Sequence, residues 1–297
     1  MSTQNQSLNL IEKSLSNFSD HLSLVMSKPT VTAYVYDVRR FFDYLADIKV
    51  RRISSIKTEH LTSYLAKCKE AGKSDASINR YYMSIKSYIK FMRKSKVIEN
   101  DITEDMKAPR MKQKAPKVPT KEEVNILLEK PDVNTYSGLR DRAILELLYS
   151  SGLRASELCD LQITDLMTNS ITVSCGKRNK TRTVPITQQA YDWIQLYICE
   201  YRGHDSGPLF MTRLGRPVRR QLLCKMVMDY ARKAKLEHIT PHTLRHACAT
   251  HLLNQGADIL LIQKILGHSS ISSTQRYTHL SSYKMQEMFH NFHPRCK

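Results

Sequence analysis

Apolar residues recur every three or four positions over residues 8–100, with polar residues between them, which predicts helices packed against one another. A break at residues 27–29 separates the first two helices, because the proline at its end is unfavourable inside a helix. The third helix is expected at about residues 57–70, and the fourth begins near Ser74. We therefore expect a four-helix bundle.

The fourth helix has two different faces. Its apolar positions, which include Ile78, Tyr81 and Ile85, are expected to pack into the bundle. Its opposite face is basic and carries Arg80, Lys86, Lys90, Arg93 and Lys94. Such a face is either solvated or laid on a phosphate backbone, and we expect the second.

The helical periodicity stops between Ile102 and Thr120. Residues 107–119 contain three prolines, which favour an extended and semi-rigid chain. We therefore expect a linker at 107–119 between an N-terminal domain, 1–106, and a second domain, 120–297. The linker has no Asp or Glu, and its five cations are Lys107, Arg110, Lys112, Lys114 and Lys117. A basic strap of this kind is suited to passing along DNA, although an inert linker is the alternative.

The second domain is expected to begin with a helix. Thr120 and Glu123 have the spacing of a capping box, in which each residue caps the other's backbone N–H. A long helix is expected at about residues 138–150, where Gly152 turns the chain. Ser156 is then expected to cap a short helix.

Residues 169–187 alternate between apolar and polar side chains, which predicts a β-hairpin with a basic tip. Two more helices are expected at about residues 188–200 and 219–235. Trp193 and Tyr197, one helical turn apart, are expected in the core rather than stacked on bases. The second domain is therefore predicted to be mainly α with a small β-sheet.

The stretch from residue 240 onwards begins as a helix, because Thr240 is a good N-cap and Pro241 fits the first helical position. His242 and Arg245 are three residues apart, so they share one face near the positive end of that helix. A second helix is expected at about residues 258–266.

Gly267 ends this second helix and is followed by His268, and a hydroxyl-rich segment then leads to Arg276 and Tyr277. A guanidinium with flanking imidazoles suits a phosphate-like anion, and a tyrosine hydroxyl is a nucleophile for such a centre. The alternative is a helical core piece whose His and Arg side chains are solvated.

Charge favours a polyanionic partner. The formal net charge is +18 and the isoelectric point is about 9.6, which is typical of nucleic-acid-binding proteins. The nine glycines disfavour a glycine-rich nucleotide-binding fold. No run of apolar residues has the length of a membrane span, and the N-terminus does not resemble a secretory signal.

Seven scattered cysteines without a C-x-x-C pair indicate reduced thiols, and we expect a cytoplasmic protein. The motif HTLRH at 242–246 is similar to the zinc helix of metalloproteases, but Thr243 stands where the catalytic glutamate belongs. We therefore expect no metal site and no cofactor.

Together these motifs resemble the tyrosine recombinase (phage integrase) family, with the compact Xer-type members most similar. The segments that carry the resemblance are SGLRASEL, GKRNKTRTVPI, TPHTLRHACATHLLNQGAD, ILLIQKILGHSSISSTQRYTHL and FHPR. The resemblance implies a SAM-like helical core-binding domain and an α+β catalytic domain that form a C-shaped clamp on DNA.

The resemblance also assigns roles by position. It implies that Arg154 and Arg245 are the catalytic arginines and that Tyr277 is the nucleophile. The remaining catalytic positions fall on Lys177, His242 and His268, and the supporting positions on Glu157 and His246.

Two of these assignments leave alternatives open. Because Arg178 stands where relatives often have glycine, the hairpin cation that reaches the phosphate is Lys177, Arg178 or Lys180. Tyr283, six residues after Tyr277, is a weaker candidate for the nucleophile.

The family's chemistry implies a metal- and ATP-independent strand transfer through a 3′-phosphotyrosyl link and a Holliday junction. Its partners would be paired inverted-repeat sites on duplex DNA in a tetramer, formed by this chain or with a homologous recombinase. A tail helix at about residues 283–292 would dock into a neighbouring protomer. A topoisomerase-like relaxase and a catalytically silent DNA-binding regulator are the alternatives.

Overall fold

The computed structural model describes residues 2–50, 52–104, 106, 118–175, 180–267 and 282–296. The chain divides into two units, Met1–Ala115 and Pro116–Lys297, so the boundary falls inside the expected linker. The linker cations from Lys107 to Lys117 lie outside the described residues. Within the described ranges, each helix is too short or too polar to cross a lipid bilayer.

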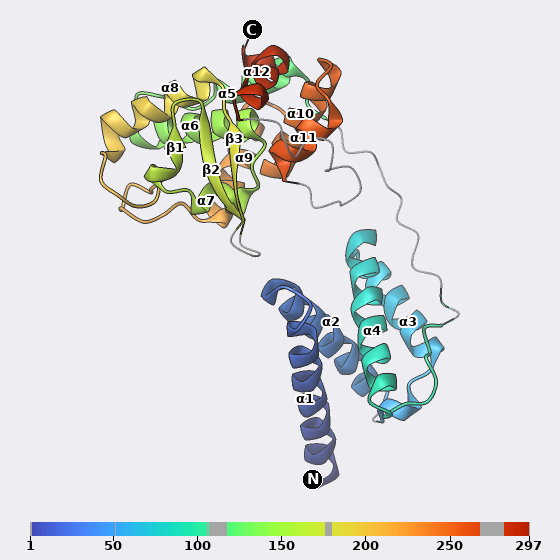
Figure 1. The fold of residues 1–297 in the computed structure, drawn as a ribbon. Helices are drawn as coiled ribbons and strands as arrows, with labels where there is room; N and C mark the ends of the chain where they lie inside the picture. Colours follow the sequence, from blue (N-terminus) through green and yellow to red (C-terminus); the bar gives the residue numbers. More distant parts are fainter. Residues whose placement is uncertain are drawn as a thin grey trace. The chain divides into compact units, whose positions relative to one another are not determined.

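The N-terminal unit is the expected four-helix bundle (Figure 1). Its helices are α1 (Ser2–Ser23), α2 (Lys28–Asp47), α3 (Thr58–Glu70) and α4 (Asp75–Lys94). The core is rich in aromatic rings; those of Phe18 and Phe42 meet Tyr88 edge to face, with centroids 5.2 and 5.5 Å away. The helix α4 begins next to Ser74 as predicted, and the Ser74 hydroxyl caps it by accepting a hydrogen bond from the Ser77 N–H at 3.2 Å.

The second unit is mainly helical with one small sheet, as predicted. Its helices are α5 (Lys121–Leu128), α6 (Tyr136–Ser151), α7 (Ala155–Asp160), α8 (Gln188–Tyr197), α9 (Arg220–Lys233), α10 (Pro241–Asn254), α11 (Ile259–Leu266) and α12 (Ser282–Phe292). The capping box is formed: the Thr120 N–H donates to Glu123 at 2.8 Å, and the Glu123 N–H donates to Thr120 at 3.2 Å.

The sheet has the order β1-β2-β3, with β1 (Leu166–Met167) antiparallel to β2 (Ser170–Cys175) and β2 antiparallel to β3 (Lys180–Pro185). The predicted hairpin is therefore confirmed, whereas the two-residue β1 is too short to leave a pattern in the sequence. On one face, Ile171 pairs with Val184 and Val173 pairs with Arg182.

The central helix is α6, which is buried on all sides from Gly138 onwards. Charged residues inside it are paired: Arg140 binds Asp141 at 2.7 Å, and Arg142 binds Glu146 at 2.9 Å. Tyr197 is fully buried as predicted, and Trp193 is partly buried under the Arg142 guanidinium, which lies 4.8 Å from its ring centroid.

The described part of the C-terminal segment contacts its own domain. Residues 286–296 pack on their own domain, where Phe289 and His293 are completely buried. Arg295 forms an ion pair with Glu146. Met288 and Phe292 of α12 are partly buried against the same core, and docking of the tail into a neighbouring protomer stays a prediction.

Candidate active site

The site is organised around the turn that follows α6. Gly152 ends the helix in the left-handed conformation, with φ of 60°. A Cβ at this position would also lie 2.6 Å from Leu266 Cδ2, so glycine suits both the positive φ and the close packing of the Leu266 side chain. The turn places Arg154 immediately before α7.

Arg154 is bound to Glu157 through both its backbone and its side chain. The Arg154 N–H donates to Glu157 Oε2 at 2.8 Å, and Nη1 donates to Oε1 at 2.8 Å. Glu157 therefore caps α7, and the cap expected from Ser156 is wrong. The Arg154 side chain remains 46% exposed, so its guanidinium is accessible to a ligand.

Arg245 approaches the same place from α10. That helix begins as predicted, with Thr240 accepting the Thr243 N–H at 3.1 Å and Pro241 in the first turn. Arg245 is buried, and its guanidinium donates to the Gly152 carbonyl at 2.6 Å. Burial and, next, the like charge of Arg154 lower the pKa of Arg245 to about 10, so it stays charged at neutral pH.

A third arginine, Arg182 on β3, completes the cluster and was missed by the sequence analysis. Its Nη1 and Nη2 bind Glu157 Oε1 and Oε2, each at 3.0 Å. The alternation of the strand could have revealed it. Residues 182, 184 and 186 share one face, and Val184 and Ile186 are completely buried. A cation in an inward-facing register predicts a carboxylate partner.

The three guanidiniums converge on the C-terminal end of α11. Arg182 donates to the Ile265 carbonyl at 3.3 Å, Arg245 to the Leu266 carbonyl at 2.7 Å and Arg154 to the Gly267 carbonyl at 3.3 Å. The last carbonyls of a helix lack helical partners and carry the negative end of its dipole, so they attract cations. Three arginines from three elements are thus fixed at three consecutive carbonyl groups.

Electrostatics keeps Glu157 ionised. Burial alone would raise its pKa, but hydrogen bonds from Arg182 and from the Arg154 N–H, together with the charge of Arg182, outweigh burial and lower it. The described residues of the cluster therefore supply three positive charges and one negative charge. Such a cluster has an unbalanced positive charge that an anion would neutralise.

The other expected catalytic residues are only partly described. His242 and His246 are exposed on α10, so the structural role expected of His246 gains no support from packing. Lys177, Arg178, His268 and Tyr277 lie outside the described residues, as does the side chain of Lys180. His268 directly follows Gly267, whose carbonyl binds Arg154. Over the ranges that the structure covers, no group of three His, Cys, Asp or Glu residues is placed to hold a metal ion.

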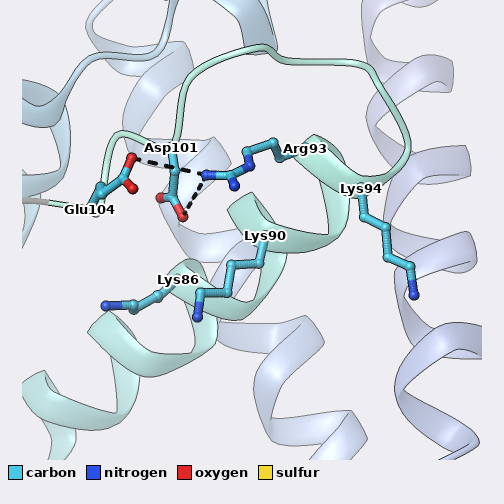
Figure 2. Close-up of a pocket in the computed structure, with 6 residues that line it drawn as sticks. All are labelled: Lys86, Lys90, Arg93, Lys94, Asp101 and Glu104. Atoms are coloured by element: carbon cyan, nitrogen blue, oxygen red, sulfur yellow. Dashed lines mark ion pairs between the residues drawn. The ribbon is translucent and has the colours of Figure 1, made fainter.

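The basic face of α4 is a second candidate surface, on the N-terminal unit. Lys86, Lys90, Arg93 and Lys94 line an open depression of about 620 Å³ together with Asp101 and Glu104. Figure 2 shows Arg93 directed towards the two carboxylates, each at 4.0 Å, and Lys94 directed away from them.

Arg80 differs from these four residues. It binds the buried Asp37 at 2.7 Å, and Ser84 donates to the same carboxylate oxygen at 2.9 Å. Arg80 therefore has a role inside the bundle that the sequence pattern did not reveal, while its expected contact with DNA stays a prediction.

Comparison with known proteins identifies both units. Residues 117–284 match the phage integrase family, and residues 15–96 match the phage integrase N-terminal SAM-like domain. The chain is 36% identical over 281 residues to tyrosine recombinase XerD of Halalkalibacterium halodurans, covering 91% of this chain and 93% of that protein. It is 37% identical over 279 residues to XerD of Staphylococcus aureus, covering 91% and 94%.

A solved structure with a similar fold is the Tn1549 transposon integrase in complex with transposon right end DNA. The TM-score is 0.72 at 21% sequence identity, covering 92% of this chain and 97% of that one. The fold, the two matched domains and the extent of the identity agree with one another. The chain therefore belongs to the phage integrase family and is a site-specific tyrosine recombinase.

Proposed function

We propose that Arg154 and Arg245 bind the scissile phosphate of duplex DNA while Tyr277 attacks it. These two arginines, together with Arg182 and Glu157, are here called the arginine centre. One observation supports this most: three guanidiniums meet at one helix end with a single carboxylate among the described residues. A phosphodiester is the anion that DNA supplies. Planar guanidinium forks bind its non-bridging oxygens with two parallel hydrogen bonds.

Arg154 and Arg245 would act differently in this centre. Arg154 is half-exposed and is suited to contact the phosphate directly. Arg245 is buried, where its charge is less screened by water and its field on a nearby anion is stronger. Both charges would stabilise the additional negative charge that develops on the phosphate oxygens during attack.

The proposed reaction exchanges one phosphate ester for another. The Tyr277 phenol oxygen forms a bond to phosphorus, and the bond from phosphorus to the 5′ oxygen breaks. The phenol proton leaves with help from His242, and Lys177 protonates the departing 5′ oxygen. The products are a 3′-phosphotyrosyl link and a free 5′-hydroxyl. Because the ester bond is conserved, the reverse attack by another 5′-hydroxyl rejoins the strand without ATP.

The assembly follows from the same proposal. Strand exchange between two duplexes needs paired inverted-repeat sites and four active sites, which this chain would supply as a tetramer or together with a homologous recombinase. The basic face of α4 would lie on the DNA backbone. We place the reaction in the cytoplasm, on the nucleoid, and assign it to resolution or to integration and excision of a mobile element.

Capture of covalent adducts tests the proposal. The purified protein is incubated with a library of nicked inverted-repeat duplexes, and the DNA that stays attached after denaturation is sequenced. We expect one family of sites from the wild type, no adduct from Tyr277→Phe, and unchanged yield from Tyr283→Phe. An adduct formed by Tyr277→Phe would refute the assignment of the nucleophile.

Two further measurements define the reaction. Lys177→Ala should cleave normally when the 5′ oxygen at the scissile bond is replaced by sulfur, a better leaving group that needs no proton. Pairing of two selected sites should precede strand exchange. Relaxation of a plasmid that lacks the selected site would instead indicate a topoisomerase.

A further inference from the structure

Arg182 lies at an unusual position for a charged residue. It continues the inward-facing row of β3 beyond Val184, and its strand partner Val173 is also buried. Its side chain is only 14% exposed, compared with 46% for Arg154. A guanidinium is placed in such an apolar register only where its hydrogen bonds compensate for lost hydration.

The Glu157 carboxylate is shared evenly by two arginines. Oε1 accepts from Arg154 Nη1 at 2.8 Å and from Arg182 Nη1 at 3.0 Å. Oε2 accepts from the Arg154 N–H at 2.8 Å and from Arg182 Nη2 at 3.0 Å. A carboxylate has about four acceptor positions, so Arg182 fills half of them.

We propose that Arg182 is a positioning residue for recombination: it clamps Glu157 and the end of α11, and through both it holds Arg154 in the geometry that binds the phosphate. This inference rests on the proposed function, because it gives a use to the orientation of Arg154. Arg182 acts through its neighbours, since its guanidinium is engaged by Glu157 and by the Ile265 carbonyl.

Gly267 supplies an independent reason for this role. A Cβ at Gly267 would lie 3.0 Å from the Arg182 guanidinium carbon and 3.1 Å from two of its nitrogens. The end of α11 therefore packs directly against the Arg182 guanidinium. The Gly267 carbonyl, in turn, accepts the hydrogen bond from Arg154 Nη2.

A simple core role would give a different result from a positioning role. If Arg182 served only to fill space and satisfy Glu157, its loss would lower stability without changing the rate of the folded enzyme. If it orients Arg154, the loss appears in the cleavage step, while binding of a single DNA site, which relies on many phosphate contacts, changes little.

The first experiment compares Arg182→Ala and Arg182→Lys with the wild type on the nicked duplex recovered by adduct capture. We expect single-turnover cleavage to fall about 10- to 100-fold in both variants, as is common for residues that orient a reactive group. Lysine should not rescue, because one ammonium cannot bridge both carboxylate oxygens. The dissociation constant for one site should change less than about threefold, a shift well below that expected for cleavage.

Controls separate positioning from general damage. Arg232→Ala removes an exposed arginine of the same domain, paired with Asp229 at 3.3 Å, and should cleave as the wild type does. The double variant Arg182→Ala/Glu157→Gln should cleave no more slowly than the slower single variant, because both changes break one linkage. Multiplied defects in the double variant, or wild-type cleavage by Arg182→Ala, would overturn the inference.

A second experiment needs no DNA. In the full-length protein labelled at arginine side chains, the order parameter of the Arg154 Nε–H bond is measured by NMR, with its signal assigned from Arg154→Lys. We expect it to fall to about 0.6 or lower, the flexible range, in Arg182→Ala and to stay unchanged in Arg232→Ala. An equally rigid Arg154 in Arg182→Ala would overturn the inference. The absence of any adduct with the wild type would instead refute the proposed function, and the two failures are distinguishable.

Discussion

Two glutamates of the second unit each hold two arginines, yet their surroundings differ. Glu157 binds Arg154 and Arg182, while Glu146 binds Arg142 and also Arg295 from the C-terminal segment. The Glu146 side chain is fully buried, and its two arginines are 11% and 17% exposed. Arg154, in contrast, is 46% exposed.

The two clusters contain the same residue types but differ in their net charge and in how accessible their arginines are to a ligand. At Glu157 a third guanidinium, Arg245, adds positive charge next to the exposed Arg154, so the arginine centre is prepared for an anion from outside. At Glu146 the Arg142 guanidinium is directed inward, towards the Leu128 carbonyl and the Trp193 ring, and the Arg295 ion pair attaches the tail to α6. The first cluster would serve catalysis and the second serves folding.

The largest expected effect concerns stability. Glu146→Ala leaves Arg142 and Arg295 with little solvent and without their counter-charge, which should lower the free energy of unfolding by about 3–5 kcal/mol. Trp193, the single tryptophan, lies under Arg142, so its fluorescence in urea reports on this domain. Asp229→Ala, in an exposed pair, should leave the urea midpoint unchanged.

Loss of less than about 1 kcal/mol in Glu146→Ala, the size expected of exposed pairs, would show that the two clusters do not differ as proposed.

The same conservative change should have opposite consequences in the two clusters. Arg154→Lys loses the fork that binds Glu157 and the Gly267 carbonyl, and we expect single-turnover cleavage to slow about 10²- to 10³-fold, or about 3–4 kcal/mol in the barrier. Arg142→Lys should lower stability while folded enzyme still cleaves at the wild-type rate. The comparison fails if Arg142→Lys slows cleavage as much as Arg154→Lys.

Local signals in the sequence predicted most elements of the fold. The helix start near Ser74, the caps at Thr120 and Thr240 and the hairpin at residues 169–187 each depend on neighbours within a few positions. Each is confirmed. The cap at Ser156 was predicted wrongly because α7 already begins at Ala155, and Glu157 accepts the N–H of Arg154, the residue before the helix.

Contacts between residues far apart in the chain could not be predicted from the pattern of apolar and polar residues. The contacts of the tail with Tyr149 and Glu146 could not be read from the pattern, because these partners lie about 150 residues earlier in the chain. Docking of the tail into a neighbouring protomer stays a prediction. Arg182 was missed for the same reason, since its partner Glu157 is on another element.

Acid should lower the free energy of unfolding of the second unit, because two of its histidines are buried. Burial lowers the pKa of His293 to about 3 and also lowers the pKa of His251, whose Nδ1 lies 2.8 Å from the Tyr149 hydroxyl. An unfolded chain binds protons at these sites below about pH 6.5 while the folded chain does not, so stability is complete above that pH and falls below it. Lowering the pH from 7 to 5 should cost about 2 kcal/mol at His293 alone, from about 1.4 kcal/mol per pH unit.

Urea unfolding followed by Trp193 at the two pH values measures this loss. His293→Phe should reduce the difference between pH 7 and pH 5, and His204→Phe, which changes an exposed histidine, should preserve it. An unchanged difference in His293→Phe would mean that this imidazole is not buried in the neutral form.

The smallest expected effect tests whether the tail is held mainly by the buried ion pair. Arg295 Nη1 also donates to Asn125 Oδ1 at 3.3 Å, an exposed contact at the edge of the Glu146 cluster. Asn125→Ala should lower the local stability of the tail by only about 0.5–1 kcal/mol, the usual net value of one hydrogen bond. Hydrogen exchange of the His293 amide, which donates to the Phe289 carbonyl at 2.9 Å, should therefore become about two- to fivefold faster.

The control is Gln189→Ala, an exposed change on α8, which should leave that exchange rate unaltered. If Asn125→Ala released the tail as completely as Glu146→Ala, the exposed contact would be the principal anchor, and burial would not be what distinguishes this cluster from the arginine centre.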